Sequence, residues 1–389
     1  MNLLHDKRPE LVGQPGVHAL IIGVSEYPFL AGGANAVADP WDMGQLTSTA
    51  STAHKVFDWL KTARLPVPLA TCRVLLSPSP TEPHLAGIGD PATFDNVFAA
   101  AHEWRTDASS HRGNITFFYF AGHGVARSKE DAVLCLHNFR EPPPAAPALR
   151  RAIDVATLTA GMSPSPAQPE IARTQFYFID ACRVKPDQLS KFTQPQTTAL
   201  WDPTSEGQDD RSAPVLYASV SNALAGAIPG VQTLFSRALI ACLTGEAGDS
   251  LGEDAAGNPK WGVTIQSLTE ALGEKIDEIN VDLGGDQNYT IGGLNKPATI
   301  CLLDQPPSVD VVLSVDPPAA CEVSKLVITG NDGQPRVFDP PFLHPVQEKF
   351  QAGLYSVSMT FNPPAPPFAD RTRFKEARAP RSDWKVSVV

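Results

Sequence analysis

The chain has 389 residues, of which 42% are hydrophobic and 19% are charged, and its formal net charge is -11. This composition predicts one large folded domain with a smaller one, and excludes a wholly disordered chain. The negative charge argues against a nucleic acid or an anionic membrane as a partner, because binding to phosphate groups requires a basic surface.

Cysteine usage and the first residues indicate an intracellular protein. The six cysteines are widely spaced without a CxxC pair, so we expect neither a structural zinc site nor a disulfide framework. Charged residues between Asp6 and Glu10 leave no apolar core for a secretory signal. No run of 18 apolar residues could span a membrane. We therefore expect a soluble, cytoplasmic protein.

Strands and helices are predicted to alternate along the first 304 residues. Val17 to Val24 is a continuous apolar run, typical of a strand that is buried on both faces. The apolar residues of 47–63 recur at helical spacing. Further strands are expected at 72–77, 114–122, 132–138, 174–184 and 213–221, and further helices at 91–108, 152–162, 233–245 and 264–280. This alternation predicts an α/β fold with a mostly parallel sheet flanked by helices.

The pattern changes after about residue 304, where helical spacing ends. Residues 305–389 contain short alternating strands and turn signals, among them the "NDGQP" turn and the strand "QAGLYSVSMTF". We expect a small antiparallel β-sandwich domain here, after a first domain at 1–304.

Two strand ends carry residues that could perform chemistry, as expected for a parallel sheet. Gly122-His123-Gly124 follows one apolar strand, and Asp180-Ala181-Cys182-Arg183 follows another. The 59 residues from His123 to Cys182 leave room for one helical crossover between neighbouring strands. Alone, either residue is more often a packed core residue, but together they are the minimum equipment for thiol acyl transfer.

At this point the sequence resembles the caspase-type cysteine peptidases, which comprise caspases, metacaspases and their prokaryotic relatives. The resemblance covers about residues 15–304, and its motifs occur in family order. They are "HALIIGVSEYPFL", "FFYFAGHG", "DACRV" and "APVLYASVSNALA" followed by "TLFSRALIACL". The resemblance implies a caspase-hemoglobinase-type fold and the activity of a cysteine endopeptidase that acts on protein substrates.

The resemblance also implies roles for individual residues. Cys182 would be the nucleophile, His123 the general base and acid, and the N–H groups of Gly124 and Cys182 the oxyanion hole. Residues 15–184 would correspond to the large subunit and 213–304 to the small subunit of such enzymes. The polar segment 185–212 would be the inter-subunit loop of a zymogen, cut by the enzyme itself or by an upstream activating protease. Candidate cut sites are Lys185, Lys191 and Arg211.

The sequence differs from these relatives at the positions that set substrate preference. Asp180 matches metacaspases, which cleave after Arg or Lys, but their second acid is replaced by Thr52, and Ala121 stands where they can carry a serine. A single buried carboxylate favours a basic residue before the cut, since an unpaired charge is costly to bury. Alternatively, Asp180 only orients the loop or pairs with Arg183.

Two serines at the end of the strand expected at 213–221 are further candidates for the substrate pocket. Ser219 and Ser221 either line this pocket or are an ordinary strand end.

No metal or cofactor is expected. Calcium dependence is an alternative, because acidic residues occur at 209–210, 253–254 and 282–286, although they form no EF-hand. The family resemblance also suggests a role in prokaryotic stress or antiviral defence. The competing function is that of a catalytically silent caspase-like scaffold.

Overall fold

The structure is a computed structural model, and it describes residues 1–128, 131–142, 147–183, 185–193, 195–201, 209–218, 232–284, 287–330 and 333–389. Ser219 and Ser221 of the predicted substrate pocket lie outside the described residues. The chain divides into two units. The first contains Met1–Ile240 and Lys275–Ala298, and the second contains Ala241–Glu274 and Thr299–Val389.

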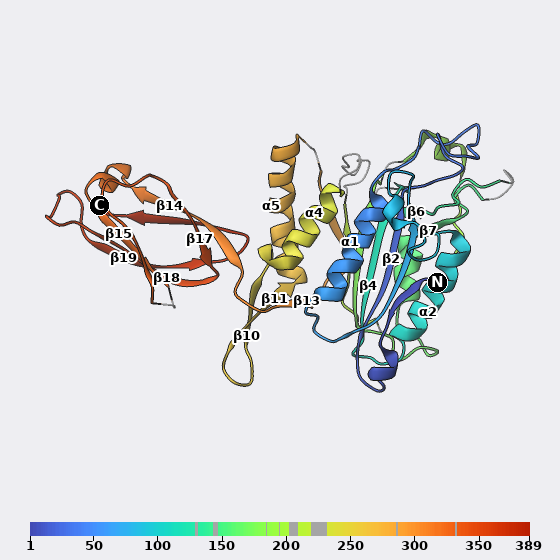
Figure 1. The fold of residues 1–389 in the computed structure, drawn as a ribbon, viewed down its shortest axis with the longest axis horizontal. Coiled ribbons are helices and arrows are strands. Elements are labelled where there is room, and N and C mark those ends of the chain that lie inside the picture. Colours follow the sequence, from blue (N-terminus) through green and yellow to red (C-terminus); the bar gives the residue numbers. More distant parts are fainter. Residues whose placement is uncertain are drawn as a thin grey trace. The chain divides into compact units, whose positions relative to one another are not determined.

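A seven-stranded sheet in the order β1-β3-β2-β4-β8-β9-β12 forms the centre of the first unit (Figure 1). Its strands are β1 (Leu3–Asp6), β2 (Val17–Val24), β3 (Leu69–Ser77), β4 (Ile115–Gly122), β8 (Thr174–Ala181), β9 (Ala213–Tyr217) and β12 (Thr290–Leu294). The five inner strands are parallel, whereas the edge strands β1 and β12 are antiparallel to their neighbours. This arrangement confirms the expected α/β fold with a mostly parallel sheet.

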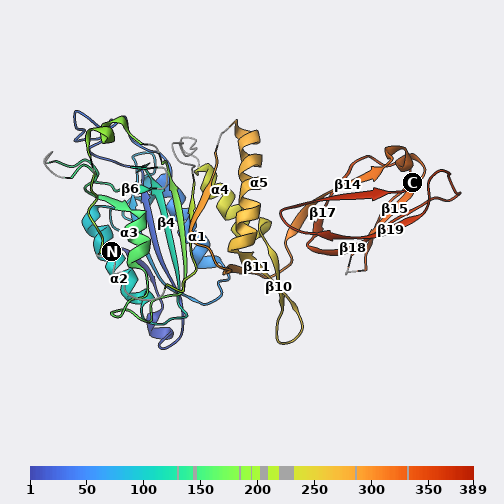
Figure 2. The same ribbon diagram turned by 180° about the vertical axis from the view of Figure 1, so that it is seen from behind.

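Helices cover both faces of this sheet, which explains why its inner strands are continuous apolar runs. All eight residues of β2 and of β4 are buried. Helix α1 (Thr49–Thr62) and helix α2 (Phe94–Ala108) lie on opposite faces (Figure 1), and the view from behind shows the same arrangement (Figure 2). The remaining helices are α3 (Val155–Gly161), α4 (Leu234–Ala241) and α5 (Ile265–Leu283).

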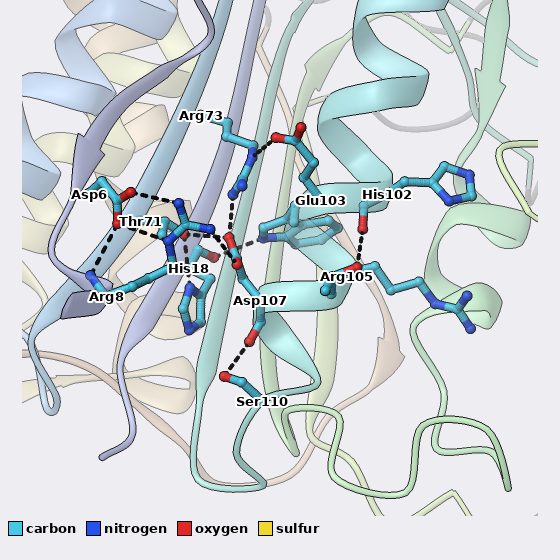
Figure 3. A network of polar contacts seen from close by, with 12 residues as sticks. Asp6, Arg8, His18, Thr71, Arg73, His102, Glu103, Arg105, Asp107 and Ser110 are labelled. Carbon is cyan, nitrogen blue, oxygen red and sulfur yellow. Dashed lines mark hydrogen bonds and ion pairs between the residues drawn. The ribbon is translucent and has the colours of Figure 1, made fainter. Parts of the chain in front are cut away.

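An ion-pair network joins β3 to α2 (Figure 3). The buried Arg73 of β3 donates to Asp107 at 2.5 Å and to Glu103 at 3.0 Å, both on α2. Asp107 also accepts from Arg8 at 3.1 Å, and Arg8 in turn holds Asp6. The buried charge of Arg73 is therefore paired by carboxylates, as burial of a guanidinium requires.

A small antiparallel sheet of β5 (Gly124–Val125), β6 (Val133–Cys135) and β7 (Ala152–Asp154) lies directly after β4 in the chain. The helix expected at 152–162 begins only at Val155, because its first residues form β7. Asp154 ends that strand and caps the helix, where its carboxylate accepts from the N–H groups of Ala156 and Thr157 at 2.8 and 3.2 Å.

The second unit contains only β-sheets apart from its share of α4 and α5 and short helical turns. One sheet has the order β10-β11-β13, with β10 (Asp249–Glu253), β11 (Pro259–Thr264) and β13 (Thr299–Leu303). A three-stranded sheet, β17-β14-β20, and a four-stranded sheet, β16-β15-β18-β19, follow. Their strands are β14 (Ser308–Asp316), β15 (Lys325–Thr329), β16 (Pro335–Phe338), β17 (Val346–Gln351), β18 (Gly353–Thr360), β19 (Arg371–Ala377) and β20 (Arg381–Ser387).

These last two sheets enclose one core, to which Leu313 and Trp384 contribute from one sheet and Ile328 and Met359 from the other. The strands form the expected all-β sandwich with one difference. The first and last strands of the sandwich, β14 and β20, pair in parallel, so the sandwich is not purely antiparallel. Within the described residues, no helix is both long enough and apolar enough to cross a membrane.

Candidate active site

His123 and Cys182 follow neighbouring strands at the same edge of the main sheet. β4 and β8 are parallel, with Ala121 opposite Asp180 and Gly122 opposite Ala181. His123 and Cys182 are the next residues after this last pair. Both residues line one cavity of about 510 Å³. The sequence predicted both strand ends, and the strand register is what brings them together.

The two glycines that flank His123 allow this close approach. A Cβ atom on Gly124 would lie 2.4 Å from the carbonyl oxygen of Cys182, which is far inside contact distance. A Cβ atom on Gly122 would lie 2.7 Å from the hydroxyl oxygen of Tyr27. Neither position tolerates a side chain without a shift of the loop, so both glycines are required by space.

The His123 ring is held by a backbone carbonyl. Nε2 lies 2.8 Å from the carbonyl oxygen of Gly44, and because a carbonyl can only accept, Nε2 must carry the hydrogen. In the neutral ring, Nδ1 is then the atom that can accept a proton. Burial lowers the pKa of His123, and the hydrogen bond to Gly44 partly opposes this. The neutral base is thus favoured near neutral pH.

Cys182 differs from the other five cysteines in its exposure. It is partly exposed at the cavity, whereas Cys72, Cys135, Cys242, Cys301 and Cys321 are buried. Burial raises the thiol pKa of Cys72 and of Cys135, which opposes thiolate formation there. Cys182 is therefore the cysteine with both access and a neighbouring histidine.

Asp180 lines the same cavity, and its two carboxylate oxygens differ in their hydrogen bonding. Its Oδ2 accepts from the hydroxyl of Tyr119 at 2.8 Å and from the hydroxyl of Thr233. Its Oδ1 is buried and has no hydrogen-bond partner among the described residues. Burial raises the pKa of Asp180 to about 6, although the two hydroxyl donors lower it. Arg183 instead stacks on the Tyr217 ring, at 4.5 Å from its centre.

Thr52 and Ala121 support the cavity without lining it. Thr52 is fully buried, and its hydroxyl oxygen accepts from the N–H of Thr233 at 3.2 Å. Ala121 is buried in β4 opposite Asp180. Thr233 is therefore hydrogen-bonded both to Thr52 and to Asp180 and links the two. Sequence reasoning missed Thr233, which is separated from its partners by the long segment after β9.

The three candidate cut sites lie in different surroundings. Lys185 is exposed and lines the cavity, and Lys191 is exposed at the end of the short 3-10 helix Asp187–Lys191. Arg211 is buried, and its guanidinium donates to Asp209, Thr159, Gln175 and Ser163. The two lysines are available to a protease in this conformation, whereas the Arg211 side chain is not.

Three of the acidic residues considered for calcium bind partners of their own in the protein. Asp209 accepts from Arg211, and Asp210 pairs with Arg112 and Arg173, each at 2.5 Å. Asp254 accepts from backbone N–H groups of its own turn. Among the described residues, no group of three or more His, Cys, Asp or Glu side chains could hold a metal ion.

Comparisons with known proteins agree with this arrangement. The family model of the caspase domain, Peptidase_C14, matches residues 17–256. This match supports a cysteine peptidase family. The chain belongs to the caspase-domain family, as the sequence motifs predicted.

No curated protein matches the sequence. Among solved structures, the chain is similar to the crystal structure of protein GSU0716 from Geobacter sulfurreducens, with 12% sequence identity and a TM-score of 0.43. That match covers 73% of this chain and 95% of the other.

Proposed function

We propose that this protein is a cysteine endopeptidase that cleaves protein substrates after a basic residue, with Cys182 as nucleophile and His123 as general base and acid. The observation that supports the proposal is that His123 and Cys182 directly follow the neighbouring parallel strands β4 and β8 and line the same cavity. A Cys–His pair in a cleft is the arrangement that thiol acyl transfer requires.

The proposed reaction has two steps. The Cys182 thiol gives its proton to Nδ1 of His123, and the sulfur attacks the substrate carbonyl carbon. The peptide C–N bond then breaks as His123 returns the proton to the leaving amine, which leaves a thioester on Cys182. Water hydrolyses this thioester, with His123 again taking and returning the proton, so that the acid product leaves and the thiol is restored.

The oxyanion of the tetrahedral intermediate would be bound by the N–H groups of Gly124 and Cys182. Pairing between β5 and β6 supports the role of Gly124. His123 and Cys135 are joined by a ladder hydrogen bond, so the next pair, Gly124 and Leu134, is a non-hydrogen-bonded pair. The N–H of Gly124 therefore points away from β6 and is available to a substrate oxygen.

Asp180 supports a preference for Arg or Lys before the cut. Its Oδ1 is buried at the cavity without a described partner, and an unpaired buried acceptor is stabilised when a cationic side chain binds it. Two further carboxylates, of Asp42 and Asp187, line the cavity against a single lysine, Lys185. This excess of negative charge also favours a cationic substrate residue.

A proteolytic switch is part of the proposal. The exposed Lys185 and Lys191 follow Cys182 closely, and Lys185 borders the cavity itself. A cut after either residue would release the segment that runs past the nucleophile and allow it to rearrange. Neither metal nor cofactor is required for the two chemical steps.

A positional-scanning peptide library tests the proposal directly. Purified protein, intact or cut in the 185–212 segment, is expected to cleave peptides with Arg or Lys before the scissile bond, equally with calcium or with a chelator. The Cys182→Ala variant should fold but release no product. Equal turnover by this variant would refute the role of Cys182 as nucleophile. No cleavage of any peptide by either form of the wild type would refute the peptidase function in favour of a silent scaffold.

A further inference from the structure

The hydroxyl of Tyr27 is inserted into the backbone ladder that holds the catalytic loop. It accepts from the N–H of His123 at 2.8 Å and donates to the carbonyl oxygen of Cys135 at 3.1 Å. The N–H of Cys135 donates directly to the carbonyl oxygen of His123 at 2.9 Å. In an ordinary antiparallel pair the two residues would exchange both bonds directly. Here the second bond passes through a side-chain hydroxyl.

This insertion fixes the position of the His123 backbone. Tyr27 is fully buried, and its ring lies 4.8 Å from the imidazole ring, centre to centre. Loss of the hydroxyl would leave the N–H of His123 and the carbonyl of Cys135 without this partner in a buried site, or would draw the two strands together. Either response moves the loop that carries the general base.

Gln45 connects this backbone contact to the contact made by the imidazole. Its side-chain amide accepts from the N–H of Tyr27 at 2.9 Å and donates to the carbonyl oxygen of Tyr27 at 2.8 Å. The preceding residue, Gly44, accepts from Nε2 of His123. Both ends of the loop from Tyr27 to Gln45 therefore contact His123, and the Gln45 amide ties the two ends together.

We propose that Tyr27 and Gln45 are positioning residues that set the orientation of His123 relative to Cys182. The inference rests on the proposed peptidase function. Neither side chain is among those that line the described cavity, so both act through His123 and not on the substrate. An error of about 1 Å in the position of a catalytic group can cost on the order of 100-fold in rate, which gives the expected scale.

The test compares Tyr27→Phe and Gln45→Leu with the matched control Tyr177→Phe. Tyr177 is also fully buried, and its hydroxyl donates to Gln175, a partner that takes no part in the contacts of His123 described here. We expect Tyr27→Phe and Gln45→Leu each to lower kcat about 10- to 100-fold with KM within about twofold. Tyr177→Phe should leave kcat unchanged. The double variant Tyr27→Phe/Gln45→Leu should lose less than the product of the single losses, because both changes release one histidine.

A second readout does not depend on peptide cleavage. The rate of Cys182 alkylation by iodoacetamide, measured against pH, reports how well the imidazole stabilises the thiolate. The midpoint of this profile should move to higher pH in Tyr27→Phe and stay in place in Tyr177→Phe. An unchanged midpoint, or a loss of kcat equal to that of the control, would overturn the inference. A wild type that is alkylated but cleaves no peptide would refute the proposed function while the alkylation profiles still decide the role of Tyr27.

Discussion

Gly124 lies directly against Cys182, so that the carbonyl oxygen of Cys182 occupies the space that a Cβ atom on Gly124 would need. Two strand-end loops that are distant in sequence thus meet as backbone against backbone. The contact fixes the distance between the histidine loop and the nucleophile loop, because it is made by backbone atoms and no side-chain rotation can relieve it.

The first prediction follows from this contact. Gly124→Ala should lower kcat/KM on the order of 100-fold, because the loop must move away from Cys182, and should cost about 1–3 kcal/mol of stability through overpacking. Peptide cleavage and urea denaturation measure the two effects. Gly292→Ala is the control, since the one described side chain that a Cβ atom there would meet is Tyr217 at 3.6 Å, an ordinary contact. Wild-type kcat/KM in Gly124→Ala would contradict the role given to this contact.

The second prediction concerns the pH dependence of cleavage. Asp180 has a pKa raised to about 6 by burial, and only its ionised form attracts a cationic substrate residue. In the wild type, kcat/KM for peptides with Arg before the cut should rise with an inflection near pH 6. In Asp180→Asn this inflection should vanish, together with the preference for Arg over neutral residues. An inflection that persists in Asp180→Asn would assign it to another group.

The third prediction concerns stability, and its sign follows from the same raised pKa. In the unfolded chain Asp180 ionises near its ordinary pKa of 3.8, so between about pH 4 and 6 the folded state holds a proton that the unfolded state has lost. The contribution of Asp180 to stability therefore decreases as pH rises through this window, by at most about 3 kcal/mol. The stability of Asp180→Asn relative to the wild type should rise between pH 4 and pH 8 by up to this amount. Urea denaturation at the two pH values measures it, and a relative stability that is flat or falls would contradict the assignment.

The fourth prediction concerns the hydroxyl that holds Asp180. Tyr119 donates to Oδ2, which lowers the pKa of Asp180. Tyr119→Phe should therefore move the inflection of the cleavage profile to higher pH. Tyr177→Phe, which removes a buried hydroxyl elsewhere in the sheet, should leave it unchanged. A downward shift in Tyr119→Phe would be inconsistent with a donor to the carboxylate.

The fifth prediction separates stability from catalysis. Asp107→Asn removes a buried partner of Arg73 and should cost about 3–5 kcal/mol, because it leaves part of a buried charge uncompensated. Glu103→Gln affects the more exposed partner of Arg73 and should cost at most about 1 kcal/mol. Urea denaturation measures both. The folded fraction of each variant should keep the wild-type kcat, since the network lies on α2, on β3 and at Asp6 and Arg8, and none of its residues lines the described cavity.

Local sequence patterns predicted the two strands of the site and the loops that follow them. The apolar runs of β4 and β8, the glycines around His123 and the position of Cys182 could be recognised because a buried parallel strand and the loop after it have local signatures. Edge strands β1 and β12 were missed, since they are short and only partly buried. An antiparallel edge strand depends on its neighbour for stability more than on its own composition.

The supporting contacts could not be predicted for a related reason. Tyr27, Gly44 and Thr233 lie far in sequence from His123 and Asp180, and they act through a hydroxyl or a backbone carbonyl that almost any loop could supply. Only the folded arrangement of the loop after β2 and of the residues before α4 selects them. The sequence likewise indicated that Asp180 would be buried near the nucleophile, but which hydroxyls would satisfy it depended on the fold.

The exposure of the six cysteines has a practical consequence. Because five thiols are buried and Cys182 opens to the cavity, an electrophilic probe should attach to a single position of the native chain. The number of labels incorporated per molecule then gives the fraction of protein in a preparation that has a reactive Cys182. Such an active-site titration would give absolute turnover numbers for every variant discussed above, and the loss of label in Cys182→Ala would serve as its blank.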